Sequence, residues 1–296
     1  MFPKVPDYHK PSKPLVPNGL GVIYVLASSV YLFLIHLFGW VETLEGVSPP
    51  LTLAVCILFG GFLGLLDDWM DLRWRYKAFL PLIAAIPLIS LSSRLALRTA
   101  ISIPLLGTID FDVLIFPGAY YFLVVPLLVT IATNTVNQLG GFNGLETVCP
   151  AIVMIGLMII SEGSSILLLC PLIVWLILAC FNVAGKIFVG NTGSFAIGIT
   201  LAAFAIISDT KSDLVISILP YIFNSALILL TYFFYRTKAN VACDGEKLCS
   251  DHRRSLVTLV TYHRPLMERK VVLIIALLTV ASTALALILH WTRVYF

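Results

Sequence analysis

The stretch PPLTLAVCILFGGFLGLLDDWMDLRWRYK, residues 49–77, decides the fold of this chain. Residues 49–66 carry no charged side chain and are mostly apolar, and Asp67 and Asp68 follow them directly. A helix that crosses a bilayer needs ~20 mostly apolar residues, which this run nearly supplies. The sudden change to acidic and then basic side chains is typical of a span that ends at the membrane surface.

The composition of the whole chain also indicates a membrane protein. Its 296 residues are 59% hydrophobic and 12% charged, and the mean hydropathy is +0.98. An ordinary soluble domain is about 25% charged. One soluble core could not hide so much apolar surface, whereas a bilayer solvates it. Residues 1–18 are polar and Pro-rich, so no cleaved signal peptide is expected. We therefore expect residues 1–296 to form one integral membrane domain.

Hydropathy predicts an all-α fold, a polytopic transmembrane helical bundle of about nine spans. Pro126 and Pro171 fall inside apolar runs, where membrane helices tolerate proline as a kink. The sequence lacks the period-2 alternation of an outer-membrane barrel. The expected spans are residues 19–39, 49–66, 78–93, 115–133, 147–161, 164–182, 194–208, 214–235 and 271–291.

The distribution of Lys and Arg predicts the orientation of the bundle. With nine spans, fifteen of the 19 Lys and Arg residues lie on the N-terminal side, and the other four are Arg94, Arg98, Lys211 and Arg293. Positive residues collect in cytoplasmic loops, so the N-terminal side is predicted to face the cytosol. Nearly all the residues suspected of catalysis lie on this side, in the loops at 67–77, 134–146, 183–193 and 236–270.

Acidic and basic side chains follow the predicted span at 49–66 together. Asp71 comes three residues after Asp68, within reach on one helical face if the helix continues, and Arg73, Arg75 and Lys77 come next. Adjacent carboxylates at a membrane edge repel each other and need a counter-charge. A divalent cation or the nearby Arg and Lys residues could supply it. The alternative is a self-neutralising loop whose arginines anchor to lipid phosphates.

The stretch TNTVNQLGGFNGLE, residues 133–146, combines Asn134, Asn137 and Asn143 with three glycines. Glycines let a backbone approach a ligand closely, and Asn amides can read a base edge or ligate Mg²⁺. Asn and Gly are also common in turns, but this segment is longer than a polar turn requires. We therefore favour a ligand-binding role for it.

Two further polar segments lie on the same side. KIFVGNTGSFAIG, residues 186–198, opens another span, which Thr192 or Ser194 could cap. Free N–H groups at the start of that helix would favour phosphate. The long cytosolic loop at 236–270 has eight basic and four acidic residues. It could grip a diphosphate or lie on anionic lipid, although the cytosolic bias alone explains an excess of Lys and Arg.

Taken together, these segments resemble the polyprenyl-phosphate N-acetylhexosamine-1-phosphate transferases. The likeness is strongest to the UDP-GlcNAc–dolichyl-phosphate GlcNAc-1-phosphotransferases of eukaryotes and archaea. It rests on LDDWMDLRWRYKAFLP (66–81), TNTVNQLGGFNGLE (133–146), KIFVGNTGSFAIG (186–198) and, less sharply, YHRPLMERKVV (262–272). It implies transfer of GlcNAc-1-phosphate from UDP-GlcNAc to dolichyl or another polyprenyl phosphate, with release of UMP. This is the first step of lipid-linked oligosaccharide synthesis for N-glycosylation.

The resemblance also implies a catalytic centre with a divalent cation, Mg²⁺ or alternatively Mn²⁺. Asp67 and Asp68 would be the catalytic acidic pair, and Lys77 would contact phosphate. Asn137 and Asn191 would sit at the metal.

Five more residues would contact the substrate by the same resemblance. Asn143 and Phe188 would recognise uracil, Phe188 by stacking, and Arg236 would grip the diphosphate and sugar. Asn134 and Glu146 would complete the substrate site. The membrane would be an archaeal plasma membrane or the endoplasmic reticulum. Lipid-facing surfaces could support a homodimer, and no nucleic acid partner is expected.

Two departures from the family pattern matter. This chain has Asn191 in GNTGS where the family has Asp in GDTGS. Mg²⁺ prefers carboxylate and phosphate oxygens to a neutral amide, so we expect weak metal binding or an inactive form. The chain also begins after the family's usual first span, which is why nine spans rather than ten are expected.

Two alternatives stay open at this stage. A sibling transferase would use another UDP-sugar or undecaprenyl phosphate. His252 and His263 are isolated here, whereas the bacterial cell-wall branch of the family has a His-rich motif, which argues against that branch. A membrane transporter would carry charges near the bilayer midplane, where the predicted spans have almost none.

Overall fold

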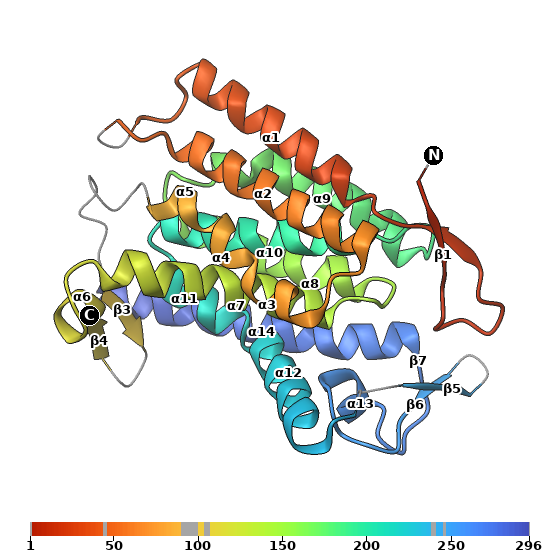
Figure 1. Ribbon diagram of the computed structural model, residues 1–296. Coiled ribbons are helices and arrows are strands. Elements are labelled where there is room, and N and C mark those ends of the chain that lie inside the picture. The colour runs from red at the N-terminus through yellow and green to blue at the C-terminus, as the bar shows by residue number, and fades with distance from the viewer. Residues whose placement is uncertain are drawn as a thin grey trace.

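The computed structural model describes residues 2–43, 46–89, 100–103, 107–237, 241–244 and 247–295. Figure 1 shows a bundle of helices with short hairpins at its ends. The helices are α1 Gly21–Leu37, α2 Pro49–Met70, α3 Trp74–Phe79, α4 Pro81–Ala84, α5 Ile86–Ile89, α6 Phe111–Leu114, α7 Val125–Leu139, α8 Leu145–Ile160, α9 Ile166–Val183, α10 Gly190–Ile207, α11 Lys211–Ser217, α12 Leu219–Leu230, α13 Leu256–Val260 and α14 Glu268–Tyr295, with π-helical turns η1 Tyr120–Val124 and η2 Thr231–Tyr235. The strands are β1 Lys4–Pro6, β2 Leu15–Pro17, β3 Ala100–Ile103, β4 Gly107–Asp110, β5 Ala242–Asp244, β6 Lys247–Cys249 and β7 Leu266–Met267.

Helix length and composition support several membrane spans. In the described part of the chain five helices are long and apolar enough to cross a membrane, or six if one bent pair counts as a span. Two more apolar helices, α1 and α8, lie at the predicted spans 19–39 and 147–161, but they have only 17 and 16 residues and are shorter than those five helices. The prediction of a polytopic helical membrane protein is therefore confirmed, whereas the count of nine spans is not shown. The five long helices are Pro49–Met70, Tyr120–Leu139, Ile166–Val183, Gly190–Ile207 and Glu268–Thr292.

Prolines divide two of the predicted spans. The region predicted as 78–93 is the run α3, α4 and α5, with Pro81 and Pro87 in α4 and α5. A proline has no N–H with which to continue the helical hydrogen bonds. Residues 90–93 of this prediction, like Arg94 and Arg98, lie outside the described residues. Pro220 stands at the start of α12, which bends by 61° from α11.

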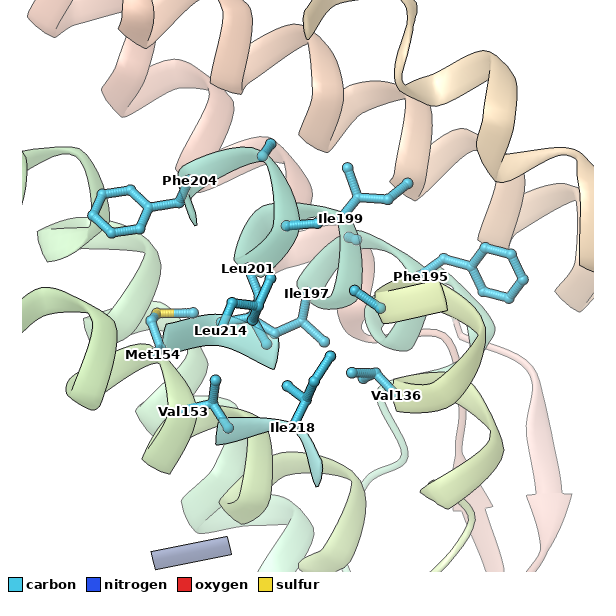
Figure 2. Close-up of a cluster of buried hydrophobic side chains, with 14 of the residues drawn as sticks. Val136, Val153, Met154, Phe195, Ile197, Ile199, Leu201, Phe204, Leu214 and Ile218 are labelled. Carbon is cyan, nitrogen blue, oxygen red and sulfur yellow. The ribbon is translucent and has the colours of Figure 1, made fainter. Parts of the chain in front are cut away.

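Helix α10 runs through the centre of the bundle. Of its 18 residues, 89% are buried, as expected for a helix that is apolar on all sides. Figure 2 shows Ile197 and Leu201 of α10 among Val136 of α7, Met154 of α8 and Leu214 of α11. Because α10 is packed on several sides, its N-terminal residues are held in a fixed place relative to α2, α7 and α8.

Glycines bring α2 against the start of α10. Gly64 of α2 lies where a Cβ would collide with the carbonyl oxygen of Asn191. One turn earlier, a Cβ on Gly60 would lie 3.2 Å from the Cα of Ala196. Asp68 follows Gly64 by one turn and therefore lies on the same face. The close approach of the two helices carries its carboxylate to the N-terminus of α10.

The small sheets lie outside the helical core. β1 and β2 form an antiparallel hairpin, and β5, β6 and β7 form a three-stranded antiparallel sheet. Figure 1 shows both at the same end of the bundle, with β3 and β4 at the opposite end. The predicted loop at 236–270 thus contains this sheet and α13, and α14 already begins at Glu268. Residues 238–240 and 245–246 of that loop lie outside the described residues.

Candidate active site

The carboxylate of Asp68 caps α10 from a distant part of the sequence. One oxygen accepts from the backbone N–H of Asn191 at 2.9 Å. The other accepts from the N–H of Thr192 at 2.9 Å and from its hydroxyl at 2.7 Å. The first N–H groups of a helix lack partners inside the helix, and the positive end of the helix dipole favours an anion. Asp68 therefore accepts from the N–H groups that we expected to be free to bind a phosphate.

The predicted local cap of this helix is wrong. The residue at the N-cap position of α10 is Val189, which makes no side-chain cap hydrogen bond, so neither Thr192 nor Ser194 stands at the N-cap. Thr192 donates its hydroxyl to Asp68, and Ser194 donates its own to Oδ1 of Asn137 at 2.7 Å. Sequence alone could not reveal that a carboxylate from α2 would take over the capping role.

Asp67 faces a different partner from its neighbour. Its side chain is fully buried, and Oδ1 accepts from Nζ of Lys77 at 2.8 Å and from the N–H of Leu72 at 3.1 Å. Oδ2 has no hydrogen-bond partner among the described residues. Asp71 ends α2 with a φ of 45°, and its exposed side chain lies 3.6 Å from Nζ of Lys77. The helix therefore does not continue far enough to place Asp71 beside Asp68 on one face.

A cavity of about 380 Å³ opens at the N-terminus of α10. Five predicted site residues line it: Asp68, Asn137, Glu146, Phe188 and Asn191. They come from α2, α7, α8, the start of α10 and the segment that leads into α10, so residues far apart in sequence meet at one place. The structure thus brings together the three motifs that the sequence analysis singled out.

The donor set of this cavity suits a hard cation only in part. Asn137, Asn191 and Asp68 offer oxygens, which Mg²⁺ prefers. However, the two amides are neutral, and Asp68 already accepts three hydrogen bonds. Over the residues that the structure describes, no group of three or more His, Cys, Asp or Glu side chains could hold a metal. The residues therefore fit a cation that a bound diphosphate also coordinates, rather than one held by protein alone.

Asn182 of α9 holds the cavity wall together. Its Nδ2 donates to Oε1 of Glu146 at 2.9 Å and to the carbonyl of Ile187 at 2.9 Å. Its Oδ1 accepts from the N–H of Gly144 at 2.7 Å and from the hydroxyl of Thr147 at 3.0 Å. Because one buried amide joins the glycine-rich turn, α8 and the segment before α10, these three pieces keep a fixed geometry.

The N-terminal hairpin forms another wall of the cavity, which Asp7, His9 and Asn18 line. Oδ2 of Asp7 accepts from Nδ2 of Asn143 at 2.8 Å and pairs with Nζ of Lys10 at 3.0 Å. Burial raises the pKa of Asp7, but these hydrogen bonds and the charge of Lys10 outweigh burial, so the pKa lies below its usual value. The carboxylate is therefore ionised near pH 7.

His9 sits at the tip of the hairpin and stacks on Phe142, with ring centroids 4.0 Å apart. Burial lowers the pKa of His9, against the raising effect of the charges on Glu268 and Asp7. Its imidazole is therefore mostly neutral near pH 7. The stacked ring fastens the hairpin to the glycine-rich turn.

Several predicted site residues do not line this cavity. Lys77 is engaged by Asp67 on the other side of α2. Nδ2 of Asn134 donates to the carbonyls of Ala78 and Thr130, at 3.3 and 3.0 Å, and so links α7 to α3. Asn143 is buried and donates to Asp7 and to Glu268. Arg236 is exposed at the end of η2.

Sequence reasoning missed the hairpin and Asn182. Asp7, His9 and Asn18 lie in a polar, Pro-rich segment without a recognisable pattern, and Asn182 ends an apolar run. The charge distribution did place residues 1–18 on the same side as the other polar segments. That was the available signal for the hairpin, but it could not show which side chains would reach the site.

A helical membrane bundle whose polar segments converge on one oxygen-lined cavity is the architecture of a membrane enzyme that handles phosphates. The chain belongs to glycosyl transferase family 4, whose model matches residues 50–209. It is thus a transferase of the glycosyl-1-phosphate type, and the family expected from the sequence is confirmed.

Curated relatives agree with this family. A Saccharolobus solfataricus protein is 30% identical over 97% of this chain and 88% of its own length. Its provisional name is UDP-N-acetylglucosamine–dolichyl-phosphate N-acetylglucosaminephosphotransferase. The Saccharomyces cerevisiae protein of that name is 26% identical over 74% of this chain and 58% of its own length. A phospho-N-acetylmuramoyl-pentapeptide-transferase of Streptococcus uberis is 27% identical over 75% of this chain and 69% of its own length.

Proposed function

We propose that this chain transfers GlcNAc-1-phosphate from UDP-GlcNAc to dolichyl or another polyprenyl phosphate and releases UMP. The observation that carries the proposal is the meeting of Asp68, Asn137 and Asn191 in one cavity. The chain is a member of glycosyl transferase family 4, and two of its relatives carry names that state this reaction. The transfer would begin the lipid-linked oligosaccharide used in N-glycosylation.

The reaction exchanges one phosphoanhydride bond for another. A phosphate oxygen of the lipid attacks the β-phosphorus of UDP-GlcNAc, the bond from that phosphorus to the bridging oxygen breaks, and UMP leaves with the oxygen. A phosphate monoester is mostly ionised near pH 7, because its second pKa is ~6. Asp67 or Asp68 takes any remaining proton or orients the acceptor, and Lys77 offsets the negative charge of the phosphates.

A lipid acceptor would reach this site along the membrane plane. Trp69 and Trp74 lie between Asp67 and Lys77 in the sequence, Phe79 follows Lys77, and the three side chains are 82%, 49% and 64% exposed. Exposed tryptophans favour the membrane–water interface. A polyprenyl chain could therefore stay in the bilayer while its phosphate meets Lys77. The bias of Lys and Arg supports a site that faces the cytosol.

Asn137 and Asn191 would hold Mg²⁺ or Mn²⁺ together with the donor, beside Asp68. A bound cation would offset the charge of the diphosphate in the ground state and during transfer. Since both amides are neutral, we propose that cation affinity is low without UDP-GlcNAc. The chain is then a slow or inactive form relative to one with Asp at position 191.

A second candidate is a sibling transferase with another UDP-sugar or with undecaprenyl phosphate. The Streptococcus uberis relative supports this reading by its name. Competition among UDP-GlcNAc, UDP-GalNAc and UDP-MurNAc-pentapeptide would separate the candidates. The preferred donor should compete best at equal concentration.

The proposal is tested by transfer of labelled GlcNAc-phosphate to dolichyl phosphate, with and without Mg²⁺, on this chain and on Asn191→Asp. Cation-dependent formation of the lipid product and UMP by either form supports the reaction. If both forms bind and transfer another UDP-sugar instead, the sibling reading replaces this one. A folded protein that acts on no UDP-sugar contradicts both readings.

A further inference from the structure

A second cavity, of about 510 Å³, adjoins the first. His9 and Gly140 line both cavities. At the end of α7, Asn137 lines the first cavity and Gln138 lines the second. Successive residues of an α-helix point about 100° apart, so this helix end separates the two spaces. One ligand with two different parts can thus place one part in each cavity.

The described residues that line the second cavity are uncharged, and the one titratable side chain among them is the mostly neutral His9. His9, Gln138, Asn224 and Ser255 supply polar groups, and among the described residues that line it there is no Asp, Glu, Lys or Arg. The remaining wall is largely apolar. Such a surface suits a neutral ring that carries hydroxyls and an apolar substituent. It suits a phosphate poorly, because none of the described lining residues is a cation that could pair with it. Its apolar lining is Leu139, Phe142, Ile228, Val241 and Val257.

Asn224 of α12 brings a buried donor to this cavity. The residue is 1% exposed, and its Oδ1 accepts from the backbone N–H of Leu256 at 2.8 Å. Its Nδ2 has no hydrogen-bond partner among the described residues. Turning the amide over would set its NH₂ group against the Leu256 N–H, so the orientation is fixed by chemistry. A buried donor without an acceptor costs free energy, and a ligand oxygen would remove that cost.

We propose that the second cavity binds the acetamido-bearing sugar ring of the donor, and that Nδ2 of Asn224 donates to the acetamido carbonyl. This inference rests on the proposed function and adds to it a residue that selects the sugar. The nucleotide and diphosphate occupy the first cavity, beside Asp68 and Asn191. The sugar enters the second past Gly140, and its acetamido methyl lies against the apolar wall. The selectivity then comes from one donor with a fixed direction.

The test compares binding of UDP-GlcNAc, UDP-glucose and UMP by calorimetry, in detergent with Mg²⁺, for the unsubstituted chain and Asn224→Asp. The substitution keeps the acceptor for Leu256 but removes the donor. UDP-GlcNAc should bind about tenfold more weakly, the loss expected for one hydrogen bond. UMP should bind unchanged, and the preference of the unsubstituted chain for UDP-GlcNAc over UDP-glucose should disappear.

Two further variants separate this role from a structural one. Ser225→Ala is the matched control, because Ser225 is also buried on α12 and its hydroxyl has no partner among the described residues, yet it does not line the cavity. It should bind all three ligands as the unsubstituted chain does. Val241→Phe narrows the cavity without touching the amide, and it should weaken UDP-GlcNAc but not UMP.

The outcomes distinguish the inference from the proposed function. Unchanged UDP-GlcNAc binding by both Asn224→Asp and Val241→Phe overturns the sugar site but leaves the transferase proposal standing. Equal weakening of UMP and UDP-GlcNAc by Asn224→Asp shows a general structural effect and also overturns it. If the unsubstituted chain is folded and binds neither UMP nor UDP-GlcNAc, the proposed function falls and the sugar site with it.

Discussion

Asp67 and Asp68 are neighbours in sequence, but they belong to two different regions. On the α3 side of α2, Asp67 is buried and paired with Lys77, a side chain that is 27% exposed. On the α10 side, Asp68 is held by the N–H groups of Asn191 and Thr192. One carboxylate is thus balanced by a flexible cation and the other by fixed backbone dipoles.

Because of this difference, the groups around Asp67 can move more than those around Asp68. A lysine has a long side chain and can exchange its partner, for example for the phosphate of an arriving lipid. Backbone N–H groups at a helix terminus cannot move without unwinding the helix. The α3 side is therefore the adjustable part of the site, whereas the α10 side is preorganised. Preorganised groups contribute most to the stabilisation of a transition state.

The largest effect is expected when the preorganised side is broken. In Asp68→Ala, the carboxylate is lost and the first N–H groups of α10 lose their acceptor. Transfer of GlcNAc-phosphate should fall by about 10³-fold, in the background of Asn191→Asp if the unsubstituted chain is too slow to measure. Asp68→Asn is the control that retains one acceptor for the helix. Full activity of the alanine variant would contradict a catalytic role for Asp68.

Breaking the adjustable side should cost stability as well as activity. In Lys77→Met, the buried Asp67 carboxylate loses its cation, at a cost of about 3 kcal/mol in the free energy of unfolding. The double variant Asp67→Asn/Lys77→Met removes both charges and should regain most of that stability without regaining transfer. Thermal unfolding in detergent measures the first effect, and the lipid-product assay measures the second. Equal stability of the single and double variants would show that the pair is not coupled.

A smaller change should sharpen the role of position 191. Asn191→Asp adds a carboxylate beside Asp68, so it should raise cation-dependent transfer at least about tenfold. The two like charges should also make the protein less stable without Mg²⁺ and restore stability when Mg²⁺ is added. The difference in melting temperature with and without Mg²⁺ reports this independently of turnover. Fast cation-dependent transfer by the unsubstituted chain would contradict this role and show that residues other than Asn191 hold the metal.

The smallest expected effect concerns pH on the α10 side. The pKa of His9 is lowered in the fold by burial, against the charges of Glu268 and Asp7. The packing of His9 on Phe142 is then most stable above the ordinary pKa of 6.5 and weakens as the pH falls below it, since a His9 that has left this buried position takes up the proton first. UMP affinity of the unsubstituted chain should therefore fall more below pH 6.5 than that of His9→Phe, which keeps the aromatic ring. If the UMP affinities of the two proteins change with pH in the same way, His9 is not the source of the pH dependence.

The sequence predicted the helical membrane architecture and the meeting of its motifs, because hydropathy and residue type act locally. It did not predict where α2 ends or which carboxylate points where. Those features depend on Gly64 and on the approach of α10, which are tertiary contacts. The split of Asp67 from Asp68 follows from these contacts.

The same limit applies to the amides. Asn137 and Asn191, which the resemblance implies as metal ligands, line the cavity, whereas the NH₂ groups of Asn134 and Asn143 donate to other parts of the protein. Asn182 and Asn224 were not predicted as site residues, since each stands alone in an apolar run. Their partners come from distant segments, so no local pattern marks them.

The burial of α10 has a consequence for how the protein reaches its membrane. In the most apolar 18-residue stretch of α14 only 39% of the residues are buried, compared with 89% of the residues of α10. We therefore expect α14 to pass from the translocation machinery into lipid without other helices. α10 has a polar N-terminal end, and most of its surface contacts protein. We expect α10 to integrate stably only after α2 and α7 are present to receive it. The order of synthesis supplies those two helices first, so the centre of the site is assembled during biogenesis around a helix that scarcely meets lipid.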